Sequence, residues 1–445
     1  MRIHPLAFRR LIVLAGAGAV LAAFSHAQEP KTLPPSLLMP PAGPPSKGVI
    51  PASSVVSPAE TVATKTALFD RFRKYDQLPD LTRELVFATK SGMEWLGRDG
   101  IHQANGRFIP GLSPALGKAT EDDHFMRQAL GAFALARSAR LTGEEKYTVR
   151  ASQTILSLLA EAPKDSAGIR KLALASVVCN RVGGAAYLAL AIFELPEAAP
   201  ELRQCGEELC QFLRSRVQAD GSISFAEEGE APEADGVGLY AGPALTAIAM
   251  SNRESPAEWK KQALAKSLKH YRQQFSTLPN PMMISWMCPA FVEMHLQTRE
   301  PAAAEFVFEM CDWLVKLQFE SPDRQRATWR GGFPQVAGGK ILSAAPTIET
   351  AYYAMAIADA CRMIRTMEKP DSARYDRYRA TLTRALQFLT TLQYGEENTG
   401  HFAAHFRPAL VGAFHPSHTD GSLRVDHSAV AVAAFSQYLI AGVDR

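Results

Sequence analysis

Asp123, His124 and Arg127 begin the first of three segments in which polar side chains could do chemistry. A helix is expected over residues 122–141, and a spacing of four places Asp123 and Arg127 on one face of its first turn. Such a charged patch could bind a substrate through Arg127 and supply an acid or base through His124. The alternative is structural: Thr120 caps the helix, and Asp123 completes a capping box that needs neither His124 nor Arg127.

Glu349, Tyr352 and Tyr353 form the second segment, where a helix expected over residues 347–367 begins. Spacings of three and four place both phenols on the same face as Glu349. A carboxyl and a phenol that point together into a central cavity can perform acid–base chemistry on a sugar. We therefore assign catalysis to Glu349 and Tyr352 and substrate binding to Tyr353. The alternative is that Glu349 complements the helix dipole and the tyrosines pack between rings.

The third segment is rich in histidine, since five of the eleven histidines lie between residues 401 and 427. We expect His405 to be a catalytic partner of Glu349 and the following residues to bind a polar ligand: His401, Arg407 and Arg424. No HxxxH pair lies on an expected helix, so the sequence predicts neither a metal nor another cofactor. The alternative is an ordinary solvated loop. In either case Asp426 is expected to cap the last helix.

The elements that must position these segments are helices, because apolar residues recur every three to four positions and strand alternation is almost absent. Some stretches, such as 303–319, have one apolar face, whereas others, such as 172–195 and 430–440, are apolar nearly all round and must be buried. We expect about twelve helices, near residues 80–96, 122–141, 146–162, 170–195, 198–217, 238–252, 255–275, 284–298, 302–320, 347–367, 371–394 and 425–441.

The connections between the expected helices alternate in length. Short polar turns follow the helices that must be buried, and long Gly-rich loops precede several of them, at 97–121, 218–237, 321–346 and 395–424. A buried helix, a tight turn and an amphipathic helix form a hairpin that cannot cover its own apolar face, so six hairpins must close together. Two concentric rings result, with the long loops and the N-termini of the inner helices at one rim.

Three of the long loops share an outline, in which the chain leaves an outer helix and reaches Gly followed within three positions by an aromatic residue. These stretches are residues 218–225, 318–333 and 393–402. Their outline resembles the degenerate Q-x-x-D-G-x-W repeat of the terpenoid cyclase and protein prenyltransferase toroids. The helix count is also similar to that of six-hairpin glycosidases and toroidal polysaccharide lyases. The resemblance implies an all-α fold, the (α/α)6 toroid, over most of residues 80–441.

The start of the chain predicts export. Basic residues precede an apolar run that closes on a small-x-small cleavage site at Ala27, which is typical of a secretory signal peptide. We expect a signal peptide at 1–27, a Pro-rich disordered linker at 28–60 and the toroid domain at 61–445. The protein would then work in the periplasm or outside the cell, and its N-terminal segment is a candidate for association with the envelope.

Composition and missing motifs exclude several classes of protein. A net charge of +3 without basic runs gives no support for nucleic-acid binding. No G-x-S-x-G elbow, P-loop, G-x-G-x-x-G turn or H-E-x-x-H pair occurs. The D-x-D-D acid motif of squalene-hopene cyclases is also absent. The six cysteines are scattered along apolar stretches without CxxC spacing, so most are expected to be buried core residues.

The composition of the rim favours a polar ligand. Arg107 joins the arginines already named, and the aromatic residues Trp286, Phe333 and Tyr353 would stack on sugar rings. We hypothesise an exported carbohydrate-active protein, a polysaccharide lyase, glycoside hydrolase or epimerase, whose partner is a polysaccharide or another polar or anionic ligand. One alternative is a terpenoid-cyclase-like protein with a dry aromatic cavity. The other is a non-catalytic binding or scaffold toroid whose centre is filled by packed side chains.

Overall fold

The computed structural model describes residues 72, 74–226, 232–320 and 324–444, which belong to one compact unit spanning Thr66–Arg445. The predicted signal peptide and linker lie outside the described residues. The long helices of the described part are α1 (Asp80–Leu96), α2 (Phe125–Thr142), α3 (Glu145–Leu159), α4 (Arg181–Glu194), α5 (Pro200–Ser215), α6 (Gly242–Glu254), α7 (Glu258–Thr277), α8 (Pro281–Thr298), α9 (Pro301–Leu314), α10 (Thr350–Arg365), α11 (Ser372–Thr390) and α13 (Val425–Ile440).

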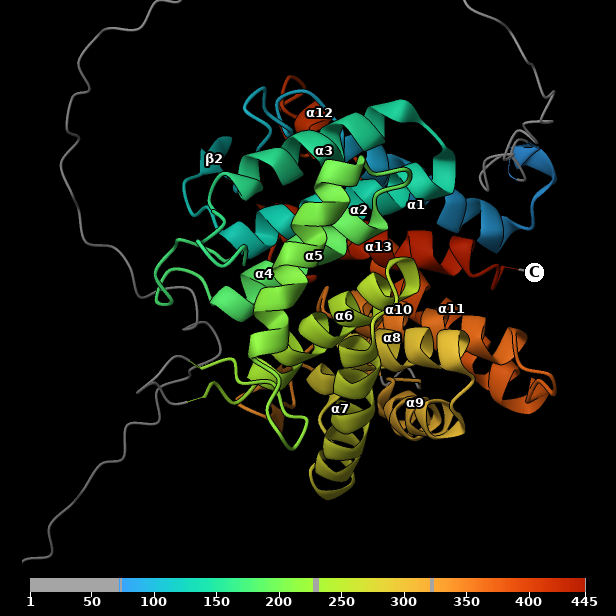
Figure 1. Cartoon of the computed structure of the whole chain (residues 1–445). Coiled ribbons are helices and arrows are strands. Elements are labelled where there is room, and N and C mark those ends of the chain that lie inside the picture. The colour runs from blue at the N-terminus through green and yellow to red at the C-terminus, as the bar shows by residue number, and fades with distance from the viewer. Residues whose placement is uncertain (1–71, 73, 227–231, 321–323, 445) are drawn as a thin grey trace, which may run out of the picture. The chain divides into compact units, whose positions relative to one another are not determined.

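These helices form a closed inner ring within an outer ring. Helices α2, α4, α6, α8, α10 and α13 contact one another in that order, and α13 returns to α2. The remaining long helices each pack on this ring, and Figure 1 shows α3, α7, α9 and α11 outside the central helices. The inner helices are buried almost all round, as in α4, where every residue from Val182 to Glu194 is buried. The predicted (α/α)6 toroid is confirmed.

Small residues let the inner helices approach closely. A five-residue π-helical turn, Val237–Ala241, leads into α6. Its Gly238 lies against α8 so closely that a Cβ atom would come within 2.4 Å of the Met282 carbonyl oxygen. At the other end of a hairpin, Gly143 adopts a left-handed conformation, with φ of 71°, and donates its N–H to Ala139. This cap makes the tight turn from α2 to α3.

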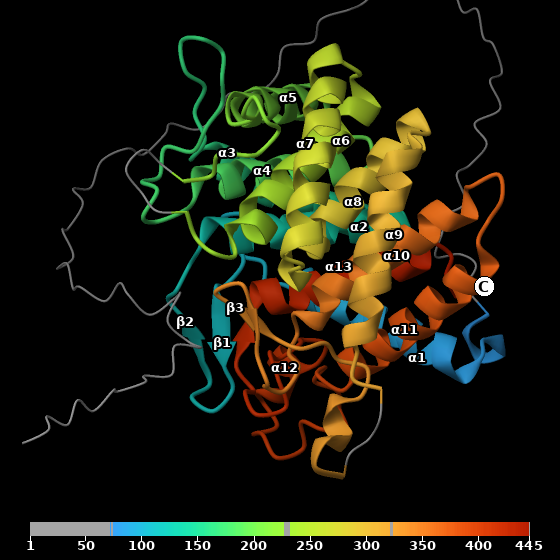
Figure 2. The same cartoon turned by 90° about the horizontal axis from the view of Figure 1, so that it is seen from below.

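The long connections meet at one end of the ring, as Figure 2 shows for β1, β2, β3 and the short helix α12 (Arg407–Leu410). Short strands join the loop before α2 to the loop before α13: β1 (Gly111–Ser113) pairs with β2 (Lys118–Thr120) and with β5 (Leu423–Arg424). The loop before α10 contains the hairpin of β3 (Val336–Ala337) and β4 (Lys340–Ile341).

Hydrogen bonds tie the remaining long connections to the same end. The Asp235 carboxylate, in the loop before α6, accepts the N–H groups of Gly338 and Gly339, each at 2.8 Å. Ile348 donates its N–H to the Pro416 carbonyl at 2.8 Å. The loops before α2, α6, α10 and α13 are thus linked to one another. The N-termini of the inner helices open into this end, which we call the rim.

One expected helix start and one expected cap are wrong. Helix α4 begins at Arg181 rather than near residue 170, because residues 160–180 form a further long connection. Helix α2 begins at Phe125, and its cap is His124, whose Nδ1 accepts the Met126 N–H at 3.3 Å. Thr120 is paired in β2 instead, so the expected capping box does not form.

The cap expected from Asp426 is also wrong. The N-cap position of α13 is Arg424, and Asp426 lies inside the first turn. Here the carboxylate binds the Arg424 guanidinium through both oxygens. The Asp426 carboxylate makes no cap hydrogen bond with the backbone, so it interacts with other side chains instead.

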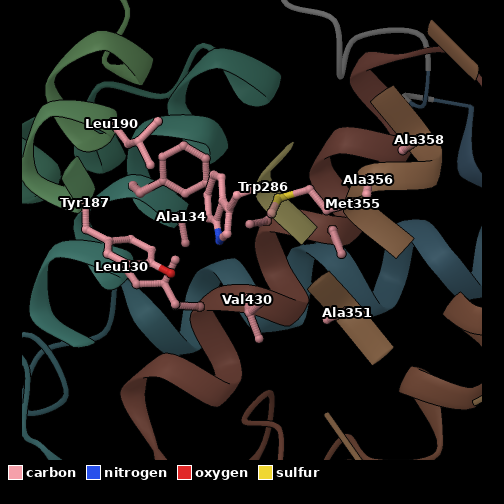
Figure 3. Packing of buried hydrophobic residues seen from close by; sticks show 14 of the residues in the cluster. Leu130, Ala134, Tyr187, Leu190, Trp286, Ala351, Met355, Ala356, Ala358 and Val430 are labelled. Atoms are coloured by element: carbon pink, nitrogen blue, oxygen red, sulfur yellow. The ribbon is translucent and has the colours of Figure 1, made fainter. Parts of the chain in front are cut away.

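The centre of the ring is packed with apolar side chains. The end of the ring at which the short turns lie contains buried ion pairs. Trp286 lies against Tyr187, with ring centroids 5.6 Å apart, as Figure 3 shows. Toward the short turns, Glu194 accepts hydrogen bonds from Arg137 at 2.9 Å and Arg140 at 3.0 Å. Charged residues of α2, α4, α6, α8 and α10 together with Gln437 of α13 line a cavity of about 30 Å³ there.

All six cysteines are free thiols, and all except Cys205 are buried, as expected. Cys288 and Cys311 lie closest, with their Sγ atoms 3.8 Å apart. Burial raises the pKa of the Cys210 thiol to about 12 and also raises that of Cys288. Such thiols are poor nucleophiles and behave as small core residues.

Candidate active site

The rim holds a cluster of polar side chains that the fold brings together from the starts of α2, α10 and α13, from α4 and from the loop before α6. We call it the rim cluster. Its members are Asp122, His124, Arg127, Tyr187, Asp235, Glu349, Tyr352, Arg424, Asp426 and His427. Several are half-buried, so that the cluster is shielded by the protein and reached by solvent.

Arg127 is the most enclosed cation of the rim cluster, because only 7% of its side chain is exposed. Its Nη1 donates to a carboxylate oxygen of Asp122 at 2.8 Å and to the Asp122 carbonyl at 2.9 Å. Its Nε lies 4.0 Å from Oδ1 of Asp426. Within the described residues, the buried Nη2 has no hydrogen-bond partner. A buried donor without a partner is costly, and a ligand oxygen would satisfy it.

Asp426 is held as an anion. Burial alone would raise the pKa of its carboxyl, but the His427 ring, the hydrogen bonds from Arg424 and the charge of Arg127 lower it to about 2. The Nε of Arg424 donates to Oδ1 of Asp426 at 3.0 Å. The carboxylate therefore stays ionised throughout the neutral and mildly acidic range.

Glu349 differs from Asp426, because its carboxyl group is partly protonated at neutral pH. It lies at the N-cap position of α10, and its Oε2 is buried without a hydrogen-bond partner in the described part of the chain. Burial raises the pKa of Glu349 to about 7, the charge of Asp235 adds to this increase, and Arg424 partly offsets it. A carboxyl with this pKa holds its proton in about half of the molecules at neutral pH, which suits a general acid.

Tyr352 connects the two carboxyl groups. Its pKa is raised well above the ordinary value, first by burial and then by the electrostatic effects of Tyr187, Asp426 and Glu349. The phenol thus keeps its proton and can donate a hydrogen bond. Glu349 and Asp426 both affect Tyr352 electrostatically, and α10 packs against α13, so the starts of these two helices lie close together.

Two histidines complete the rim cluster, and both are neutral at pH 7. Burial lowers the pKa of His427 to about 4, with Arg424 and Arg127 acting in the same direction against the opposing charge of Asp426. Its buried Nδ1 lacks a partner in the described structure. The pKa of His124 is lowered by burial and then by Arg127. A neutral imidazole can donate from one nitrogen and accept at the other.

The predicted residues His124, Arg127, Glu349, Tyr352 and Arg424 are therefore brought together. Four other predicted residues are placed differently. His401 and His405 are exposed on the loop before α12, with His401 stacked on Phe402 at 4.0 Å between ring centroids. Arg407 donates to the carbonyls of its own loop, and Arg107 binds Ser157 and Glu161 at the end of α3.

The three aromatic residues expected to stack on sugar are in the core. Trp286 is 2% exposed, Phe333 is 1% exposed and Tyr353 is fully buried. Phe333 and Tyr353 contact each other edge to face, with centroids 5.4 Å apart, and the Tyr353 hydroxyl faces the Met282 sulfur. These rings present no open face to a ligand in this structure. They fill the space between the inner helices and so help to hold the rim in position.

Two members of the rim cluster lie outside the three segments singled out from the sequence: Tyr187 and Asp235. Asp235 directly precedes the Gly-rich turn into a buried helix, which is the one signal that marked it. The described residues contain no group of three His, Cys, Asp or Glu side chains arranged to hold a metal. In the same part of the chain, no helix is long and apolar enough to cross a membrane.

Comparisons with known proteins place the fold. No family model matches the sequence, and no curated protein matches it. Solved structures do match, among them D-mannose isomerase, with a TM-score of 0.57 and 12% identity over 82% of this chain and 99% of that one. The GH76A α-1,6-mannanase from Salegentibacter sp. HEL1_6 has a TM-score of 0.55 and 11% identity, covering 80% and 99%.

A heparin-specific unsaturated glucuronyl hydrolase is also similar, with a TM-score of 0.53 and 12% identity over 80% of this chain and 96% of that one. At these identities the likeness concerns the fold. The chain is an (α/α)6 toroid of the six-hairpin type, complete in its inner ring.

Proposed function

We propose that this protein is a carbohydrate-active enzyme, and specifically a glycoside hydrolase, whose reaction takes place at the rim cluster. The observation that carries the proposal is a buried carboxyl group beside a second carboxyl group: burial and the charge of Asp235 raise the pKa of Glu349 to about 7. A carboxyl that is partly protonated near neutral pH can act as the acid, and the second carboxyl can act as the base. The similar solved structures, a mannanase, a glucuronyl hydrolase and a mannose isomerase, support a sugar substrate.

In the proposed reaction, Glu349 gives its proton to the glycosidic oxygen as the bond from that oxygen to the anomeric carbon breaks. A water molecule forms the new bond to the anomeric carbon, and Asp235 takes the proton that this water releases. Arg127 Nη2 and the neutral His427 hold sugar hydroxyl groups. Tyr352 donates to the substrate between them.

The polar character of the rim cluster argues against the two alternatives. A terpenoid cyclase needs a dry aromatic cavity, whereas arginines, histidines and carboxylates meet at this rim. A packed scaffold does not need buried polar atoms without partners, because each lowers its stability; within the described residues Arg127, Glu349 and His427 each have one. Strongly shifted pKa values such as that of Glu349 also cluster at functional sites.

The proposal extends to an exported protein. The sequence of residues 1–27 favours cleavage after Ala27, and a sugar polymer outside the cytoplasm or in the envelope would then be the partner. Incubating the purified full-length protein with neutral and acidic polysaccharides, followed by mass analysis of released oligosaccharides, tests the activity. Products that carry one added water per cleaved bond support hydrolysis. Absence of any product across the panel would argue against the proposed function.

The rate should depend on pH through Glu349. Because the general acid works in its protonated form, kcat should fall as the pH rises through about 7 and should be retained below it. Glu349 is protonated below about pH 7, so the highest rate is expected in the neutral to mildly acidic range. A pH profile of kcat with an alkaline limb near 7 checks this. A rate that rises through pH 7 would contradict the assignment of Glu349 as the acid.

A further inference from the structure

The cations of the rim cluster are already paired with carboxylates. Arg127 Nη1 lies 2.8 Å from the carboxylate of Asp122, and Arg424 Nε lies 3.0 Å from that of Asp426. The 4.0 Å contact between Arg127 and Asp426 joins these pairs into one line, in which carboxylates and guanidinium groups alternate. The two positive charges are therefore balanced by two negative ones before any ligand binds.

The other groups that face this line add no positive charge. Asp235 contributes a further carboxylate, which accepts two backbone N–H groups and makes no ion pair within the described residues. His124 and His427 are uncharged at neutral pH because burial lowers the pKa of each ring. A carboxylate or sulfate on a ligand would meet Asp122, Asp235 and Asp426 without a cation left to compensate it.

What remains free suits hydroxyl groups. Among the described residues, three buried atoms of the rim cluster lack a hydrogen-bond partner: a donor, Arg127 Nη2, a ring nitrogen, His427 Nδ1, and a carboxyl oxygen, Glu349 Oε2. A hydroxyl donates one hydrogen bond and accepts others, so neighbouring sugar hydroxyls satisfy donors and acceptors together. A carboxylate only accepts, and it would leave Glu349 Oε2 facing a second anion whenever Glu349 is ionised.

We infer that the rim cluster selects a neutral sugar residue over its uronic acid counterpart, and that Asp122 and Asp426 set this selectivity by compensating Arg127 and Arg424. This inference rests on the proposed function, because it assumes a sugar at this site. It narrows the substrate to neutral glycans. The similar glucuronyl hydrolase acts on an unsaturated glucuronyl group, so the inference separates this chain from that neighbour in substrate charge.

The test uses matched sugars that differ only in the group at C6: glucose and glucuronate, mannose and mannuronate, and galactose and galacturonate, all as methyl glycosides. Binding to the full-length protein is measured by calorimetry at pH 7 and moderate salt. We expect the neutral member of the best-bound pair to bind at least tenfold more tightly than the acidic member. Equal or tighter binding of the acidic member would overturn the inference while leaving a sugar-binding site in place.

Asp122→Asn gives the decisive variant, because it removes the negative partner of Arg127 and keeps the size of the side chain. We expect it to reduce the preference for the neutral member by about fivefold or more, since Arg127 and Arg424 then share the single carboxylate of Asp426. Asp123→Asn is the matched control: Asp123 binds Gln128 and the His124 N–H and makes no bond to Arg127. Equal preferences in Asp122→Asn, Asp123→Asn and the parent protein would refute the role of Asp122.

If no member of any pair binds, the failure lies with the proposed function, and the inference falls with it. The two failures are thereby distinguished: a sugar that binds without regard to charge overturns the inference alone. Measuring at two salt concentrations adds a further check. Any affinity that Asp122→Asn gains for the acidic members should weaken with salt, because screening acts on an uncompensated charge at a half-exposed site.

Discussion

Replacing Glu349 with Gln is expected to lower kcat for glycan cleavage by about 10²–10⁴-fold, the usual contribution of a general acid. Glutamine keeps the shape of the side chain and its hydrogen-bonding capacity, but it cannot give up a proton. KM should change little, since substrate binding depends on Arg127 and His427. The alkaline limb of the pH profile near 7, caused by the Glu349 pKa, should also disappear from any residual rate.

The matched control for this variant is Glu258→Gln. Glu258 is exposed on α7, where it accepts a hydrogen bond from Gln262 of the same helix. This change removes one carboxyl far from the inner ring and should leave kcat within twofold of the parent. Full activity in Glu349→Gln would remove Glu349 from the mechanism. A melting temperature equal to or above that of the parent protein would show that the loss of rate is not caused by unfolding.

Replacing Glu194 with Gln is expected to lower the free energy of unfolding by about 3–5 kcal/mol at neutral pH, because it leaves buried cations without their anion. Only 1% of the Glu194 side chain is exposed, and it receives Arg137 and Arg140 together. The exposed pair of Glu309 and Arg272 gives the comparison. Glu309→Gln should cost no more than about 1 kcal/mol. Urea unfolding of both variants measures the difference.

The pH dependence of this effect has a definite sign. Burial alone would raise the pKa of Glu194, but Arg137 and Arg140 lower it to about 2, below its ordinary value of 4.5. Its contribution to stability is therefore complete above about pH 4.5 and is lost as the pH falls toward 2. The stability difference between the parent protein and Glu194→Gln should shrink over that range. A difference that is small at pH 7, or constant down to pH 3, would contradict the role of this ion pair.

The helices could be predicted from the sequence because apolar periodicity is a local property. The bounds expected for α1 agree with the structure, and those of α13 differ by a single residue. The start of α4 could not be predicted in this way. Leu172 is buried although it belongs to a loop, so an apolar run there does not indicate a helix. Asn180, whose side chain accepts the Gly183 N–H, gives the true start of α4.

The part of the site that follows from the order of the helices around the ring could be predicted from the sequence. Closing six hairpins brings the starts of α2, α10 and α13 to one rim, and this juxtaposes Arg127, Glu349 and Arg424. Contacts between distant loops could not be read from local patterns. Asp235 reaches the rim cluster through its bonds to Gly338 and Gly339, about a hundred positions further along the chain.

The remaining differences between the predicted and the observed site arise because some predicted residues are buried. Trp286 looks like a sugar-stacking residue by its type, yet the inner ring needs a large ring at that position to fill its centre. The same limitation applies to Arg107, because two helices, α2 and α3, separate it in sequence from its partner Glu161. Residue type predicted the chemistry that these side chains can perform, and packing determined which of them can meet a ligand.

The most direct test of a sugar-processing rim cluster is a crystal structure of the full-length Glu349→Gln protein with an oligosaccharide that the parent protein cleaves. The account predicts a sugar at the rim, with one hydroxyl bound to Arg127 Nη2, another near His427 Nδ1, and the glycosidic oxygen within hydrogen-bond distance of residue 349. An oligosaccharide bound elsewhere, such as the surface groove between α1 and the residues that follow α11, with the rim cluster empty, would contradict it.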